Sequence, residues 1–199
     1  MSDMPRVRAV AHADKEKALY TIIVAFAADP LTRWVLPQAD RYLTYGIRIF
    51  EAFGGAAFAA GTAYEVSGFA GVALWVPPGH EDGDEAAQEA FGQTLQEIVA
   101  PERLDEVTRV LDEMQSYHPL EPCWYLPLIG VDPRHQGQGC GAKLMKYALA
   151  QCDAQGLPAY LESSNPANIT LYERHGFELM GRIQSASSPP VHPMYRAAR

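Results

Sequence analysis

The sequence has few cysteines and lacks an excess of positive charge. Its 199 residues include three cysteines, Cys123, Cys140 and Cys152, and 16 Lys and Arg against 24 Asp and Glu, for a net charge of −8. No CxxC pair or regular Cys/His spacing is present, so we expect neither a disulfide framework nor a bound metal ion. Because binding to phosphate backbones needs a concentrated basic surface, the acidic balance also argues against a nucleic-acid-binding protein.

Long apolar runs are also missing. The strongly apolar run near the start, from Ala18 to Ala28, falls well short of the roughly 20 residues that a membrane-spanning helix needs. The first ten residues carry charges where a secretory signal would be apolar. We therefore expect no signal peptide, no membrane partner and a cytoplasmic location with reduced cysteines.

What is present is the composition of an ordinary globular protein. The chain is 48% hydrophobic and 20% charged, far from the low hydrophobicity and high charge of disordered chains. At this length roughly 70% of the surface of the unfolded chain is buried on folding, so the core is large enough to be stable without disulfide bonds. We expect a single domain over residues 1–199.

Residue patterns predict a helix-rich first half and an alternating second half. The first half is expected to contain a strand over residues 5–11, helices over 14–28 and from Asp40 to Gly54, strands over 57–66 and 68–76, and helices over 85–99 and 101–117. From Cys123 the predicted order is strand, glycine loop, helix, strand, helix and strand, with strands over 123–131, 159–163 and 177–183. This order predicts a mixed α/β fold of the α+β-like kind.

A glycine-rich loop joins the predicted strand 123–131 to the helix that follows it. The helix is indicated by an apolar stripe that includes Leu144, Ala148 and Cys152. The first turn of a helix has N–H groups without partners in the helix, and glycines let a ligand approach the backbone closely. Together with the positive end of the helix dipole, this arrangement predicts a cradle for a phosphate or a diphosphate.

Several other interpretations of the loop compete with this one. A plain glycine-rich turn is the simplest. A P-loop needs Ser or Thr after its Lys, but Lys143 is followed by Leu144. The residues Gly137, Gly139 and Ala142 satisfy a dinucleotide-binding GxGxxA pattern, with Glu162 downstream. However, five residues separate Val131 from Gly137, whereas the dinucleotide turn is tight, and about 60 residues remain for the rest of a doubly wound sheet. A dinucleotide-binding oxidoreductase is thus the weaker alternative.

The motif Gln136-x-x-Gly139-x-Gly141 resembles the acyl-CoA-binding motif of the GNAT acetyltransferase superfamily. The similarity continues through residues 161–168 and 171–177, and is strongest over about 118–183. Within the superfamily the sequence is similar to the puromycin N-acetyltransferase-like branch, for example in Glu121-Pro122-x-Trp124 and Met194-x-Arg196. The resemblance implies a central twisted mixed β-sheet flanked by helices, with splayed strands that form the acyl-CoA cleft. The poorly matched N-terminal half is then expected to bind the acceptor.

The resemblance also implies which residues contact acetyl-CoA, the expected co-substrate. The backbone of the strand before the loop would pair with the pantetheine arm, and the loop amides would bind the diphosphate. Asn168 either touches the cofactor or caps the helix that follows it. The expected contact residues are Ile129, Gly130, Val131, Gln136, Gly137, Gln138, Gly139, Cys140, Gly141, Ala142 and Asn168.

Acetyl transfer to an amine needs a base that accepts the amine proton and an acid that donates a proton to the departing thiolate. Tyr172, at the matching family position, is our candidate acid, because a tyrosine with a pKa of about 10 can protonate a thiolate as it develops. Glu162, at a predicted strand end, is our candidate base, and a solvated carboxylate is its ordinary alternative. His118, Glu121 and His135 are weaker base candidates.

The predicted function is that of an N-acetyltransferase that uses acetyl-CoA and acetylates a primary amine of a small molecule by direct attack in a ternary complex. A non-catalytic acyl-CoA-binding sensor is the alternative from another class. Trp34, Tyr42, Tyr45 and the acidic residues 81–85 are expected to line or cover the acceptor pocket. The chain is also compatible with a homodimer.

Overall fold

The computed structural model, which describes residues 6–80 and 85–199, is built around one seven-stranded sheet. The strands lie in the order β1-β2-β3-β4-β5-β7-β6, and all neighbours are antiparallel except β4 and β5. The mixed α/β fold class predicted from the sequence is confirmed. The elements in chain order are β1 (Val7–Ala9), η1 (His12–Asp14), α1 (Lys15–Phe26), α2 (Pro30–Val35), α3 (Ala39–Gly54), α4 (Ala56–Ala59), β2 (Ala63–Val66), β3 (Gly71–Val76), α5 (Glu85–Ile98), α6 (Pro101–Tyr117), β4 (Trp124–Val131), η2 (Pro133–His135), α7 (Cys140–Gln155), β5 (Ala159–Ser163), η3 (Pro166–Asn168), α8 (Ile169–Glu173), β6 (Glu178–Leu179) and β7 (His192–Arg196).

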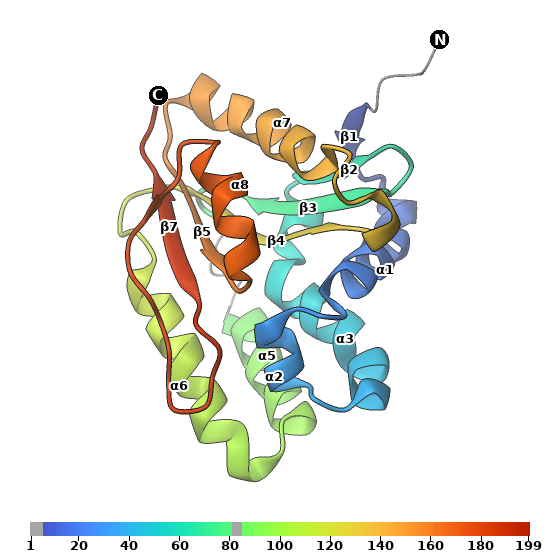
Figure 1. Ribbon diagram of the computed structural model, residues 1–199, viewed down its shortest axis with the longest axis vertical. Helices are drawn as coiled ribbons and strands as arrows, with labels where there is room; N and C mark the ends of the chain where they lie inside the picture. Colours follow the sequence, from blue (N-terminus) through green and yellow to red (C-terminus); the bar gives the residue numbers. More distant parts are fainter. Residues whose placement is uncertain (1–5, 81–84) are drawn as a thin grey trace.

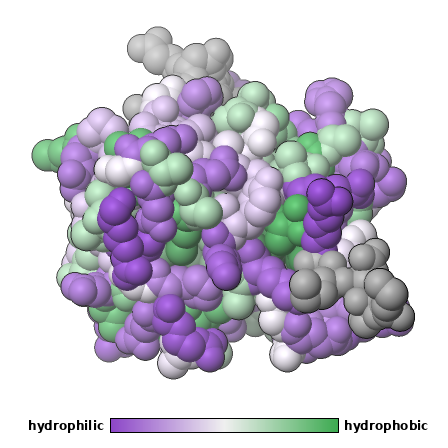
Figure 2. Space-filling view, turned by 90° about the horizontal axis from the view of Figure 1, so that it is seen from above, coloured by the Kyte–Doolittle hydropathy of each residue, from purple (hydrophilic) through white to green (hydrophobic). Residues whose placement is uncertain are grey.

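Helices cover both faces of the sheet (Figure 1). Strand β3 shows the consequence, since all six of its residues are buried. Val72 and Leu74 pack into the core shared with α1, α3, α5 and α6, whereas Ala73 and Trp75 pack into the core shared with α7. A strand covered on both faces is apolar throughout, and does not alternate with polar residues. Viewed from above, mainly hydrophilic residues form the surface, with hydrophobic ones visible between them (Figure 2).

Strands β4 and β5 diverge after three paired residues. They pair in parallel from Trp124 with Ala159 to Leu126 with Leu161, and β4 then continues to Val131 beside β3. The register between β3 and β4 shifts at this point, which places an extra residue of β4 next to Pro127. Proline has no N–H to donate to a neighbouring strand. In Figure 1, β3 and β4 run across the view, whereas β5 and β7 run steeply down it.

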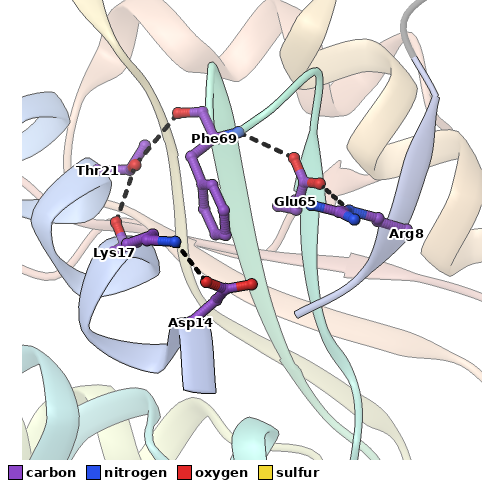
Figure 3. Close-up of polar contacts among 6 residues, drawn as sticks. All are labelled: Arg8, Asp14, Lys17, Thr21, Glu65 and Phe69. Atoms are coloured by element: carbon purple, nitrogen blue, oxygen red, sulfur yellow. Dashed lines mark hydrogen bonds and ion pairs between the residues drawn. The ribbon is translucent and has the colours of Figure 1, made fainter. Parts of the chain in front are cut away.

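Polar contacts fix the turn between β2 and β3 (Figure 3). Residues 67–69 have positive φ angles, a strained conformation for residues other than glycine. The buried Glu65 accepts a hydrogen bond from the Phe69 N–H at 2.9 Å and also contacts Arg8 of β1. On the other side, Thr21 Oγ lies 3.2 Å from the Phe69 carbonyl oxygen. The turn is thereby attached to both β1 and α1.

Several predicted elements in the first half differ in extent, including the strands expected over 5–11 and 68–76, which are observed as β1 (Val7–Ala9) and β3 (Gly71–Val76). The strand expected over residues 57–66 begins only at Ala63, because residues 56–59 form the helical turn α4. The Asp29-Pro30 pair was expected only to end a helix, but it also begins α2, with Pro30 in the first turn and Asp29 as the N-cap. Proline is compatible with that position because the first N–H groups of a helix have no intrahelical partner.

The C-terminal part of the sheet also differs from the prediction. The strand expected over residues 177–183 is reduced to β6, Glu178–Leu179. Strand β7, which was not predicted, lies between β5 and β6 and is antiparallel to both. Among the described residues, no helix combines the length and hydropathy needed to span a membrane.

Candidate active site

A cavity of about 1140 Å³ lies where β4 and β5 diverge. It is bounded by the end of α1, the second half of β4, the glycine loop, the start of α7, the end of β5 and the η3–α8 segment. Twelve of the thirteen predicted site residues line it, although the sequence places them in four separate segments. These residues are Ile129, Gly130, Val131, Gln136, Gly137, Gly139, Cys140, Gly141, Ala142, Glu162, Asn168 and Tyr172.

The backbone of β4 presents a hydrogen-bonding edge to this cavity. The Asp132 N–H donates to the Ala70 carbonyl on the β3 side at 3.0 Å. Because backbone groups alternate in direction along an antiparallel strand, those of Ile129 and Val131 face the other side, from which β5 has diverged. Consistent with this direction, the Val131 carbonyl accepts a hydrogen bond from Gln136 Nε2 at 3.2 Å. A ligand in the cavity can therefore pair with β4 as a further strand would.

Helix α1 packs closely against β4 beside this edge. A Cβ atom at Gly130 would lie 2.6 Å from the Cβ of Ala25, which is shorter than a van der Waals contact. Glycine at this position thus permits α1 to form one wall of the cavity.

The glycine loop leads into α7 with its first amides free of helical bonds. Gly137 and Gly139 have φ angles of 73° and 79°, and Gly139 is the N-cap residue. Within α7 the first such bond runs from the Lys143 N–H to the Gly139 carbonyl, so the amides of residues 140–142 precede it. Amides in this position, together with the helix dipole, bind anions such as a diphosphate.

Gln138 and Asn168 differ in their relation to the cavity. Gln138 is the one predicted site residue outside the lining, and its side-chain nitrogen donates to the Arg134 carbonyl at 3.2 Å. Asn168 lines the cavity and makes no side-chain capping bond. The preceding η3 is capped by Asn165, whose side chain accepts from the Ala167 N–H at 3.0 Å.

Glu162 lies near the end of β5 in a cluster of buried rings. Its side chain is 2% exposed, and Oε1 lies 2.9 Å from Nε2 of His118. The His118 ring packs between Tyr125 and Tyr160, with centroids 4.6 and 4.7 Å away. Burial and, to a smaller extent, the Glu162 carboxylate raise the pKa of both tyrosines. Both tyrosine hydroxyls therefore stay protonated at neutral pH.

Tyr172 lies within α8 and lines the same cavity. It is 5% exposed, and its ring packs edge-to-face with Phe177. Burial raises the pKa of its hydroxyl above the ordinary value, and the negative charge of Asp29 adds to this effect. The hydroxyl therefore remains a hydrogen-bond donor at neutral pH.

Asp29 is a site residue that the sequence interpretation missed. It is 7% exposed, and it accepts hydrogen bonds from the Thr32 N–H at 2.9 Å and from Ser164 Oγ at 2.6 Å. Both donors are neutral. The Asp-Pro pair indicated a helix boundary, and the contact with Ser164 depends on tertiary structure, so the sequence had no signal for a role in the site.

A second cavity, of about 100 Å³, adjoins the first. Five residues line both cavities: Phe26, Asp29, Pro127, Glu162 and Ser164. The rest of its described lining comes from α2, α3, α5, α6, Leu36, β4 and Val191, and is apolar except for Thr32. The two cavities therefore meet at a boundary that includes the acidic residues Asp29 and Glu162.

The aromatic residues expected in the acceptor pocket lie elsewhere. Trp34 donates to Ser187 Oγ and stacks with Arg103, the buried Tyr42 donates to the Ile23 carbonyl, and Tyr45 packs against two arginines. None of the three lines either cavity. Of the acidic segment expected to cover the pocket, residues 81–84 lie outside the described residues.

Comparisons with known proteins identify the family. Residues 106–177 match the model of the Acetyltransferase (GNAT) family. The chain is also 30% identical over 184 residues to an uncharacterized N-acetyltransferase of Schizosaccharomyces pombe, covering 82% of this chain and 70% of that protein. The chain belongs to the GNAT acetyltransferase family. The predicted superfamily and enzyme class are thereby confirmed, whereas the puromycin N-acetyltransferase-like branch stays a prediction.

Solved structures of GNAT acetyltransferases share this fold. A structure from Corynebacterium glutamicum, described as histone acetyltransferase HPA2 and related acetyltransferase, is 26% identical with a TM-score of 0.67, covering 98% of this chain and 97% of its own. Arylalkylamine N-acetyltransferase 2 from Aedes aegypti is 15% identical with a TM-score of 0.73, covering 99% and 100%. Among the described residues, no group of three or more His, Cys, Asp or Glu is placed to hold a metal ion.

Proposed function

We propose that this GNAT enzyme transfers the acetyl group of acetyl-CoA to the primary amine of a small molecule by direct attack in a ternary complex. The observation that carries the proposal is the large cavity, which is lined by the part of β4 that does not pair with β5, the start of α7, Glu162 and Tyr172. The residues proposed to bind acetyl-CoA and those proposed to react thus border one space. The structure of the Aedes aegypti relative, which is named for an arylalkylamine, supports an amine acceptor.

In this proposal acetyl-CoA lies along β4. The diphosphate binds the amides of residues 140–142 and the loop before them, and the pantetheine arm pairs with Ile129 and Val131. Asn168, which also lines the cavity, contacts the cofactor. The thioester then lies near Pro127, where β4 and β5 separate and Glu162 borders the cavity.

Glu162 is the proposed base that accepts the proton of the amine substrate. The neutral amine nitrogen attacks the thioester carbonyl carbon, a C–N bond forms, and the amine proton passes to Glu162 directly or through a water molecule. His118 is the group next to the Glu162 carboxylate, at 2.9 Å, and orients it toward the acceptor. A positioned base of this kind contributes about 10²- to 10⁴-fold to the rate.

The departing thiolate is stabilised by Tyr172. As the C–S bond breaks, the sulfur gains negative charge and the Tyr172 hydroxyl donates a hydrogen bond to it. The raised pKa of Tyr172 keeps this donor protonated. Burial disfavours the charged form of the thiol as it does that of Tyr172, so the hydrogen bond from the protonated hydroxyl is the contribution assigned to Tyr172.

Release of free coenzyme A thiol from acetyl-CoA across a panel of primary amines tests the proposal. We expect turnover that depends on both substrates. Acetyl-CoA at a hundred times its Kd should raise the melting temperature by roughly 5–10 °C, and NAD should leave it unchanged. Stabilisation by acetyl-CoA without thiol release would favour the acyl-CoA sensor, and stabilisation by NAD alone would favour the oxidoreductase. The cytoplasmic location, the homodimer and the single domain over residues 1–199 remain predictions.

A further inference from the structure

We propose that the smaller cavity holds the body of the acceptor, and that the acceptor is a monocationic primary amine with a compact apolar body. This inference rests on the proposed acetyl transfer and narrows its substrate class. It assigns the ammonium to the boundary between the cavities and the carbon skeleton to the space among α2, α3, α5 and α6.

The boundary between the cavities has the charge that an ammonium needs. Asp29 and Glu162 line both spaces, and both side chains are almost fully buried. In the part of the chain that the structure describes, neither carboxylate forms an ion pair with a lysine or arginine. Asp29 accepts from two neutral donors, and Glu162 contacts His118. An ammonium at this boundary would be an additional charged partner for the two carboxylates.

The interior of the smaller cavity is apolar, in contrast to its charged boundary. Beyond the boundary its described lining includes Leu31, Val35, Ile49, Phe53, Leu111 and Met114, and no titratable side chain other than the two boundary carboxylates. A second ammonium at the far end of a substrate would be buried without a counterion, which is strongly unfavourable. The cavity therefore selects against diamines and polyamines.

The volume limits the size of the apolar body. The cavity measures about 100 Å³, and a dry apolar cavity of about 150 Å³ is large enough to hold benzene. By the same ratio, the space beyond the boundary fits a chain of about four carbon atoms. Each buried methylene contributes about 0.8 kcal/mol, or about a fourfold gain in affinity.

An isosteric pair of substrates tests the charge selectivity directly. Pentylamine and 1,4-diaminobutane have the same length and differ at the far end, where a methyl group replaces an ammonium. With saturating acetyl-CoA, we expect kcat/KM for pentylamine to exceed that for 1,4-diaminobutane by about 100-fold or more. From ethylamine to pentylamine, kcat/KM should rise by about fourfold per methylene.

A cavity-filling variant tests whether the preference for pentylamine arises in the smaller cavity. Leu111→Phe on α6 adds volume at a partly buried lining position, and should lower kcat/KM for pentylamine by about tenfold or more while ethylamine is little affected. Leu104→Phe makes the same change two turns earlier on α6, at a partly buried position outside both cavities. This control should keep the preference for pentylamine. The KM for acetyl-CoA should be unchanged in both.

The outcomes separate this inference from the proposed function. Equal or better turnover of 1,4-diaminobutane would overturn the apolar-acceptor inference and leave acetyl transfer intact. No thiol release with any amine would overturn the proposed function. In that case calorimetric titration of both amines into the coenzyme A complex decides the inference: tighter binding of pentylamine supports it, and equal binding or none overturns it.

Discussion

The two cavities that meet at Glu162 are built from different parts of the chain in different ways. The larger one is lined on the cofactor side by backbone: the edge of β4, a loop with two left-handed glycines, and the first amides of α7. The smaller one is lined by side chains from α2, α3, α5 and α6. A backbone-built site needs glycine and a strand–loop–helix order, both of which leave a local signature in the sequence. A side-chain-built site depends on how distant helices pack, and its residues can vary without changing the fold.

Substitution of Glu162, which lies where the cavities meet, should have the largest effect on kcat/KM. Glu162→Gln removes the proposed proton acceptor, and we expect kcat/KM to fall by about 10²- to 10⁴-fold. The remaining rate should rise with pH as the amine itself loses its proton in solution. Steady-state kinetics across pH measure this change.

Two controls accompany the Glu162 variant. Its Kd for acetyl-CoA should stay within about twofold of the wild-type value, because no diphosphate contact is removed. Glu173→Gln, at an exposed position outside both cavities, should behave as wild type. A Glu162 variant with an unchanged rate and pH profile would show that the base is elsewhere.

The backbone-built cavity is tested by adding a side chain to it. A Cβ at Gly141 would already lie 3.5 Å from Leu171, so Gly141→Leu places a large group at the start of α7. Losing two or more charge-assisted hydrogen bonds to the diphosphate should weaken acetyl-CoA binding by about 100-fold. Gly141→Ala, which adds one methyl group and favours the helix, is the matched control. Calorimetry that gave equal affinities for the Leu variant and the wild type would exclude diphosphate binding at these amides.

Tyr172 tests the acid on the cofactor side. Tyr172→Phe should lower kcat by about 10²-fold with little change in KM for either substrate. The donor is the protonated hydroxyl, and its raised pKa means that it is lost only well above the ordinary value of about 10. An alkaline decline of kcat below that pH would therefore come from another group. If Tyr172→Phe had wild-type kcat, Tyr172 would have no part in the reaction.

The smallest expected effect concerns stability. Glu65→Ala removes the acceptor of the Phe69 N–H beneath the β2–β3 turn and should lower the free energy of unfolding by about 1–3 kcal/mol. Chemical denaturation measures the loss, and kcat at low temperature should be retained. Arg8→Ala removes the exposed partner of the same carboxylate and should cost less. An Arg8 variant that was the less stable of the two would show that the ion pair, and not the turn, is the stabilising feature.

The parts predicted well from sequence are those with local signals. Strand β5 has the predicted bounds, and α6 begins at the predicted Pro101. The glycine loop enters α7 as expected, because an apolar stripe and three nearby glycines mark it.

The errors arise where one local signal has two meanings or where the tertiary structure decides. Asp29-Pro30 ends one helix and begins another. Strand β7 contains Pro193, which local rules disfavour in a sheet interior, yet it pairs with β5 over five residues. The role of Asp29 depends on Ser164, which is far away in the sequence.

Hydrogen exchange of the backbone amides, with and without coenzyme A, tests the central claim most directly. We predict that coenzyme A slows exchange at Ile129, at Val131 and at residues 140–142, with smaller changes in α5 and α6. Unchanged exchange at these amides under saturating coenzyme A, or protection confined to another region, would contradict the account.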